Sequence, residues 1–387
     1  MKQKYLWILF TITILIFIIL FYRPEKVWRT IPLGASLPLN GINKELGRDV
    51  MEGANTYFRY TNDTGGIHHK HINLISYDDK YEPQNTLKNT HTLIEKDHVF
   101  ALFGFVGTPT TKKIMPVIKE IPFVAPYTGA AFLRNSEKQN IVNFRSSYGE
   151  EIENIIQYLT EKKHIHRFAI FYQNDDYGIA GYNATVKALK KRKTTLVSEG
   201  TYKRNTLSIK HALQEIKTAS PEAIILVGAY KPSARFIRQW RQNYDPETLF
   251  APISFVNADA LIGELDGKGT HIYFSLTVPS YDDNRLKIAN TYRRLLARYY
   301  PDSTPSYASF ESFLAAKAAV SALKSIHGGI TREGFVSALK RLGRDTLGDI
   351  PINYHNTQLL NQVYLSVYRD GAFHLVDEKG LAEEKKQ

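Results

Sequence analysis

The sequence predicts an α/β fold with two parallel sheets, each covered by helices on both faces. Short apolar segments alternate with amphipathic helical segments along most of the chain, which is the pattern of repeated β-α units. About ten apolar segments occur, more than one open sheet of this kind comfortably holds. The 387 residues and the 43% hydrophobic content are sufficient for two hydrophobic cores. The sequence therefore predicts two lobes.

Many of the predicted strands are rich in Val, Ile, Leu and Phe on both faces, as parallel strands between two helical layers must be. They comprise residues 30–36, 72–77, 99–105, 122–126, 141–144, 167–172, 196–201, 223–228, 249–253 and 271–276. We expect the chain to leave the first sheet for the second at residues 145–147.

Predicted helices fill the intervals between these strands. Residues 46–61 end at an Asn-Asp-Thr-Gly-Gly stop signal, and residues 83–96 begin with a proline that suits a first helical turn. The remaining helices are residues 148–162, 178–191, 208–218, 232–243, 284–300, 306–326 and 332–342. Residues 358–368 and 372–376 predict a β-hairpin with Arg-Asp-Gly as its turn.

Composition excludes several classes of site. The chain has no cysteine, so disulfides, thiolate catalysis and cysteine metal sites are ruled out. The net charge of +12 comes from basic residues scattered over predicted helices and their ends, not gathered into one patch. We expect solvated helix surfaces, which would suit an anionic membrane, and no nucleic-acid partner.

The first 29 residues differ from the rest of the chain. Residues 5–22 form an uninterrupted uncharged run, long enough to nearly span a bilayer core at ~1.5 Å per residue. No cleavage site of small residues follows it, so we expect an uncleaved signal anchor in the inner membrane. Flanking charges nearly balance and leave the orientation open.

Two strand ends carry the strongest indication of function. Residues 99–105 end in a glycine-bearing turn rich in hydroxyl groups, residues 104–111, that opens a helix. Residues 122–126 end in a second small, polar turn, residues 126–130. Adjacent parallel strands that end this way favour a site for a carboxylate or another small polar group. Neither turn holds a catalytic group, so the pattern predicts binding of a small molecule and no enzyme.

Other candidate sites have less support in the sequence. His68, His69 and His71 lie in a turn without an evident distant ligand, so we expect no metal. The sequence lacks the nucleophile elbow, the phosphate loop and the dinucleotide fingerprint, so we expect no cofactor. Asp175 and Asp176 resemble paired acids, yet beside Tyr177 and Gly178 they are better explained as shaping a turn.

Residues 30–378 resemble the type I periplasmic solute-binding proteins of the leucine/isoleucine/valine-binding family. The resemblance is collinear and rests on short motifs at residues 65–67, 77–79, 104–108, 126–130, 174–178 and 228–232. It implies two Rossmann-like lobes joined by three crossovers that close on a ligand, and delivery of the solute to an inner-membrane ABC permease.

The resemblance also implies domain limits. Residues 1–29 would be the membrane anchor and residues 379–387 a polar tail. The first lobe would comprise residues 30–147 and 277–345. The second would comprise residues 148–276 and 346–378, with the solute held between the two lobes outside the cytoplasm.

Three expected ligand contacts lie on the first lobe. The resemblance assigns the ligand carboxylate to the hydroxyl and N–H of Thr108, although that residue also fits a simple helix cap. It assigns the ligand ammonium to the backbone carbonyl of Tyr127, whose large ring is a departure from the family. Gly129 replaces a threonine, so its N–H remains but a hydroxyl is lost.

The other expected contacts lie on the second lobe. Tyr177 and Tyr230 match two tyrosines that close over the ligand, or they pack on their own lobe. Ser254 replaces a glutamate that neutralises the ammonium, which weakens that end of the site. Glu150 or Glu151 could compensate, although both also fit as first-turn acids.

The sequence thus predicts the solute-binding protein of an ABC importer, holding a small amino acid or a related carboxylate or amide. The alternative is a sensory subunit that reports the same solute to a signalling partner.

Overall fold

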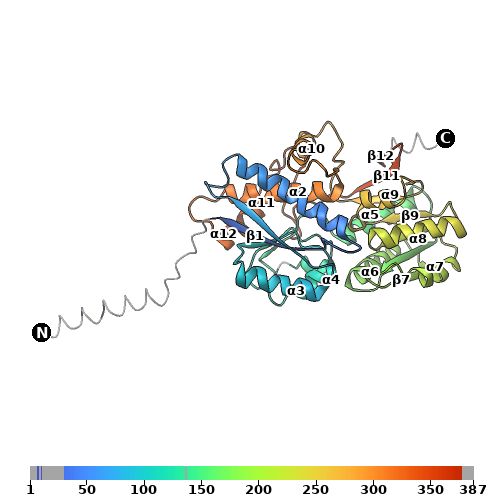
Figure 1. Cartoon of the computed structure of the whole chain (residues 1–387). Coiled ribbons are helices and arrows are strands. Elements are labelled where there is room, and N and C mark those ends of the chain that lie inside the picture. The colour runs from blue at the N-terminus through green and yellow to red at the C-terminus, as the bar shows by residue number, and fades with distance from the viewer. Residues whose placement is uncertain (1–6, 8–9, 11–29, 136, 377–387) are drawn as a thin grey trace.

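The structure is a computed structural model that describes residues 7, 10, 30–135 and 137–376. These residues form two groups of helices and strands, each built around a parallel sheet (Figure 1).

The first sheet has five parallel strands in the order β2-β1-β3-β4-β5. They are β1 (Ile31–Leu37), β2 (Ile72–Asp78), β3 (Ala101–Phe103), β4 (Phe123–Val124) and β5 (Ile141–Val142). The helices grouped with them are α2 (Lys44–Asp63), α3 (Pro83–His91), α4 (Thr108–Ile114), α10 (Lys287–Tyr299), α11 (Tyr307–Lys324) and α12 (Arg332–Lys340). Because the strands are parallel, the turns that follow β3 and β4 lie at the same edge of the sheet.

Helices α2 and α11 pack closely against each other. Gly53 of α2 makes this approach possible, since a Cβ there would lie 2.0 Å from the carbonyl oxygen of Ser309. Alanines on nearly every face of α11 allow it to be buried on all sides.

The second sheet has four parallel strands in the order β7-β6-β8-β9. They are β6 (Phe168–Gln173), β7 (Leu196–Tyr202), β8 (Ala223–Val227) and β9 (Leu249–Pro252). The helices α5 (Tyr148–Glu161), α6 (Asp176–Lys191), α7 (Lys210–Lys217), α8 (Tyr230–Asn243) and α9 (Ala258–Glu264) surround it (Figure 1). Every residue of β8 is buried, as expected for a strand between two helical layers.

A third, antiparallel sheet joins β10 (Tyr273–Leu276), β11 (Tyr364–Arg369) and β12 (Ala372–Leu375). Ile272, just before β10, bridges to Phe250 of β9, so this sheet continues the second one. Asp370 and Gly371 connect β11 to β12 with φ angles of 51° and 78°, the conformation of a type I′ hairpin turn.

The predicted α/β fold is confirmed, and so are the two parallel sheets and the C-terminal hairpin turn. The predicted crossing at residues 145–147 lies between β5, which ends at Val142, and α5, which begins at Tyr148. The prediction of a strand over residues 358–363 is wrong. There the Leu359 and Leu360 N–H groups bond to the carbonyls of Asn143 and Phe144 and hold a loop against the crossing.

Helical elements differ from prediction as well. The predicted helix 83–96 changes to a π-helical turn over Thr92–Lys96 after α3 ends at His91. Helix α9 was not predicted, because its seven residues are too few to show helical periodicity.

Within the described residues, no helix combines the length and the apolar character needed to cross a bilayer. The predicted anchor, residues 5–22, lies outside the described residues except for residues 7 and 10, and so does the polar tail.

Candidate functional site

The turns after β3 and β4 lie side by side. Val106 bridges to Tyr127, the Tyr127 N–H donates to the Phe105 carbonyl at 2.7 Å, and the Gly107 N–H donates to the Tyr127 carbonyl at 3.2 Å. Gly107 has a φ of 108°, and a Cβ there would lie 2.4 Å from the Tyr81 ring, so only glycine fits. The Tyr127 carbonyl, expected to face a ligand ammonium, thus already accepts a bond within the protein.

Three buried hydroxyls meet beside these turns. Thr108 Oγ1 lies 2.7 Å from Thr128 Oγ1 and 3.5 Å from Tyr148 Oη, and Thr128 donates to Tyr148 Oη at 3.2 Å. Tyr148 is the first residue of α5, so its hydroxyl reaches the first-sheet turns from the second group of helices. Tyr148 was not among the predicted site residues. The crowding of Gly129 against it appears only in the folded chain.

Aromatic rings from both groups pack together next to these hydroxyls. Phe255 lies between Tyr81 and Tyr127, at 6.1 Å from each ring, and its ring lies 4.6 Å from Tyr177. Tyr177 in turn lies 5.4 Å from Tyr148. All five rings are buried, and we call them the inter-lobe aromatic cluster. Tyr81 and Phe255 each follow a strand end, which is the signal that could have identified them.

The two predicted tyrosines take different positions. Tyr177 joins the cluster, and its hydroxyl donates to the Gly228 carbonyl at 3.4 Å. Tyr230 opens α8, where burial and the Glu45 carboxylate raise the pKa of its phenol. Glu45 belongs to α2, so Tyr230 faces the first group.

The acid beside Ser254 is Glu151. Its carboxylate accepts from the Ser254 N–H at 2.7 Å, from the Ser254 hydroxyl at 2.9 Å and from the Ser275 hydroxyl at 2.9 Å. Burial raises the pKa of Glu151, while these hydrogen bonds and nearby Arg145 act in the opposite direction. Glu151 thus places a carboxylate directly beside Ser254, where the side chain of residue 254 itself supplies only a hydroxyl.

Glu150 points elsewhere. Its carboxylate accepts from the Ser147 N–H and hydroxyl, both at 2.7 Å, and from the Gln358 amide, which makes it the N3 residue of a capping box on α5. The structure therefore places Glu150 at a helix cap and does not bring it to the aromatic cluster.

A buried ion pair lies behind the cluster. The Arg145 guanidinium donates to Glu311 through Nε at 2.9 Å and Nη2 at 2.8 Å, and it covers the Tyr127 ring with its central carbon 3.9 Å from the ring centroid. Thr277 donates to the same carboxylate at 2.6 Å. Arg145 Nη1 has no hydrogen-bond partner among the described residues. Residue 145 was predicted only as part of the crossing, since its partner Glu311 is distant in sequence.

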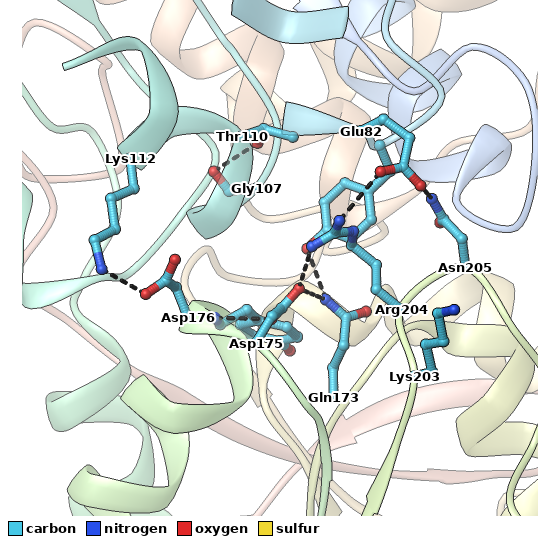
Figure 2. Close-up of polar contacts among 12 residues, drawn as sticks. Glu82, Gly107, Thr110, Lys112, Gln173, Asp175, Asp176, Lys203, Arg204 and Asn205 are labelled. Carbon is cyan, nitrogen blue, oxygen red and sulfur yellow. Dashed lines mark hydrogen bonds and ion pairs between the residues drawn. The ribbon is translucent and has the colours of Figure 1, made fainter. Parts of the chain in front are cut away.

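Polar contacts also join the two groups beside the cluster, and we call them the rim contacts (Figure 2). Lys112 of α4 bonds to Asp176 of α6 at 2.5 Å. Arg204 donates to Glu82 at 3.1 Å and to Asp175 at 3.0 Å. Asp175 also accepts from the Tyr177 N–H and caps α6, so its predicted role in shaping the turn is confirmed.

Metal ligation has no support in the described part of the chain, where no group of three or more His, Asp or Glu side chains is placed to hold an ion.

The comparisons agree with this architecture. A family model described as "Periplasmic binding protein" matches residues 30–372. Leu/Ile/Val-binding protein homolog 3 of Brucella melitensis is 22% identical over 217 residues, which are 56% of this chain and 59% of that protein. The chain thus matches less than two thirds of that relative.

Two solved structures extend the comparison. A possible leucine/isoleucine/valine-binding protein from Rhodopirellula baltica is 30% identical, with a TM-score of 0.85 over 93% of this chain and 100% of that one. The branched-chain amino acid transporter substrate-binding protein of Streptococcus pneumoniae in complex with isoleucine is 17% identical, with a TM-score of 0.77 over 90% of this chain and 99% of that one, and shows the shared fold. The matched family consists of solute-binding proteins, which are not enzymes. The chain belongs to the periplasmic binding protein family.

Proposed function

We propose that this protein is the extracytoplasmic solute-binding protein of an ABC importer and holds a small amino acid, or a related carboxylate or amide, between two lobes. One observation carries the proposal. Hydroxyls and rings from the strand ends of both sheets gather in one buried place. Such strand-end crevices are where open α/β sheets bind ligands.

The lobes follow the two sheets. Residues 30–147 and 277–345 form the first lobe, and residues 148–276 and 346–378 form the second. The pairing of β10 with β11 supports this division, because it returns the chain to the second sheet after α10, α11 and α12.

The polar ends of the ligand would meet different partners. Thr108 and the Gly129 N–H hold an oxygen-bearing end, while Tyr177 and Tyr230 cover the ligand from the second lobe. Glu151, held by Ser254, faces an amino group where one is present. A carboxylate beside an ammonium typically contributes about 1.5–3 kcal/mol, so this acid favours a zwitterion over a simple carboxylate.

A thermal-shift screen of the full chain in mild detergent tests the proposal. The panel contains the L-amino acids, their 2-oxo acids and their amides. At a concentration one hundred times Kd, a ligand stabilises the folded protein by about 2.7 kcal/mol, a shift that is easily measured. A panel without any shift would contradict the proposal.

The location is also part of the proposal, with residues 5–22 tethering the lobes to the inner membrane. Protease added to intact spheroplasts should release the lobes, and an untouched chain would contradict this. Ligand-dependent co-purification with a permease supports import, whereas co-purification with a kinase or cyclase supports the sensory alternative.

A further inference from the structure

The phenol of Tyr148 is a buried donor without a good acceptor among the described residues. Thr128 donates its own hydroxyl to the phenol oxygen, so that contact does not use the phenol proton. The other hydroxyl oxygen within reach is Thr108 Oγ1, at 3.5 Å. Hydrogen bonds between hydroxyls are normally about 2.5–3.0 Å long, so this proton is poorly satisfied. Burial raises the pKa of Tyr148 and keeps the proton in place at neutral pH.

Thr108 and Thr128 use their hydroxyls differently from several other buried threonines. Thr56, Thr90 and Thr110 each donate to a backbone carbonyl four residues earlier, at 2.5–2.7 Å. The hydrogen bonds that the Thr108 and Thr128 hydroxyls donate go only to each other or to Tyr148 within the described residues. The Thr108–Thr128 contact at 2.7 Å is a normal hydrogen bond, so it is the phenol proton that needs an additional acceptor.

Close contacts hold the Tyr148 ring in this place. A Cβ on Gly129 would lie 2.5 Å from the ring, and the Tyr148 N–H donates to the Gly129 carbonyl at 2.9 Å. The ring also packs against Tyr177, with 5.4 Å between the ring centroids. A ligand oxygen would therefore join the phenol at this site and not displace it.

We propose that Tyr148 is a specificity-determining ligand-binding residue whose phenol donates a hydrogen bond to a ligand carboxylate held with Thr108 and Thr128. The inference rests on the proposed function and refines it, because it names a carboxylate as the group that the site requires. It also accounts for Gly129, where a side chain would exclude the Tyr148 ring.

The three hydroxyls come from separate segments of the chain, and together they favour a carboxylate. Thr108 and Thr128 follow first-sheet strands, whereas Tyr148 begins α5, which packs on α6. A carboxylate with two acceptor oxygens satisfies three donors better than an amide, which has one oxygen and brings donors of its own.

Tyr148→Phe tests this inference, because it retains the ring packing and removes only the hydroxyl. Calorimetry on the full chain compares the Kd of the wild type and the variant for the L-amino acids, their 2-oxo acids and the matching amides. Tyr292→Phe is the matched control, since its buried hydroxyl bonds to Ser306 and Ser309, away from the site. Unfolding temperatures are measured for all three proteins.

We expect Tyr148→Phe to weaken carboxylate binding about 10- to 100-fold and amide binding less than about threefold. Tyr292→Phe should leave both affinities unchanged. Unchanged carboxylate binding by Tyr148→Phe would overturn the inference and assign the phenol a structural role. Tighter carboxylate binding by Tyr148→Phe would overturn it as well, because it would mean that the ligand has to displace the phenol hydroxyl.

Wild-type protein that binds amides but no carboxylate would overturn the inference and leave solute binding intact. Wild-type protein that binds nothing in the panel would remove the proposed function together with the inference.

Discussion

Arg145 and Glu311 form a bidentate ion pair in which the arginine side chain is fully buried and the glutamate side chain is 5% exposed. The pair joins the crossing segment after β5 to α11, 166 residues away in sequence. Its guanidinium also supports the Tyr127 ring from behind. This contact fixes the crossing segment at the base of the inter-lobe aromatic cluster.

Glu311→Gln should strongly destabilise the protein, because it leaves the Arg145 charge buried without a counter-charge. We expect the free energy of unfolding to fall by about 3–5 kcal/mol in urea denaturation. Glu333→Gln is the control, since Glu333 is exposed in the first turn of α12. A loss below about 1 kcal/mol would show that the pair contributes little.

Arg204→Ala should favour the open form, because Arg204 bonds to Glu82 across the rim and also holds Asp175. These groups are partly exposed, so we expect a loss of about 1 kcal/mol, or roughly a fivefold shift toward the open form. The measurement is the radius of gyration in X-ray scattering without ligand.

Arg235→Ala is the control for this experiment, since Arg235 is exposed on α8. Raising the salt concentration should expand the wild-type protein more than Arg204→Ala. An identical radius for all three proteins would contradict a role for the rim contacts in closure.

Thr108→Val should weaken the binding of a carboxylate ligand about tenfold, because its hydroxyl bonds only to other site hydroxyls within the described residues. Thr110→Val is the matched control, since Thr110 lies in the same helix and donates to the Val106 and Gly107 carbonyls. Equal losses of affinity in both variants would place the ligand elsewhere.

The stability of the protein should depend on pH through Asp49. Burial, and the nearby Asp259 carboxylate, raise the pKa of Asp49 to about 7, although Asn257 donates to it at 3.0 Å. The folded protein then holds a proton that the unfolded chain, titrating near 3.8, has released. The free energy of unfolding should therefore fall as pH rises from about 4 to about 7.

Asp49→Asn should remove this decline, so that the variant gains stability relative to the wild type at pH 8 but not at pH 4. Urea denaturation at both pH values measures the effect. Asp302→Asn is the control, since Asp302 is exposed. If Asp49→Asn and wild type show the same slope with pH, Asp49 titrates as an ordinary surface acid.

Local patterns predicted much of this molecule. The apolar segments predicted the strands of both parallel sheets, and the Asp-Gly pair predicted the hairpin turn at residues 370–371. The two strand-end turns at residues 104–111 and 126–130 were also identified, and Thr108, Tyr127, Gly129 and Tyr177 do come together. These features depend on neighbours in sequence or on the rule that parallel strands end at one edge.

Other features could not be predicted from local patterns. Glu150 and Glu151 are adjacent acids in one helical turn, yet the first caps its helix and the second crosses to Ser254 and Ser275. Which of them contacts Ser254 depends on the direction that each side chain takes around α5. That direction is defined only when β9 and β10 are in place.

The amino-acid sequence by itself determined the α/β class, the order of the strands and helices, and the family resemblance, because these depend on periodicity and short motifs. Only the tertiary structure decided that Tyr148 lies beside Thr108 and Thr128, that Phe255 joins the tyrosines, and that Arg145 pairs with Glu311. Each of these contacts joins residues far apart in the chain, and the packing of distant helices, strands and turns, which no local pattern encodes, brings them together.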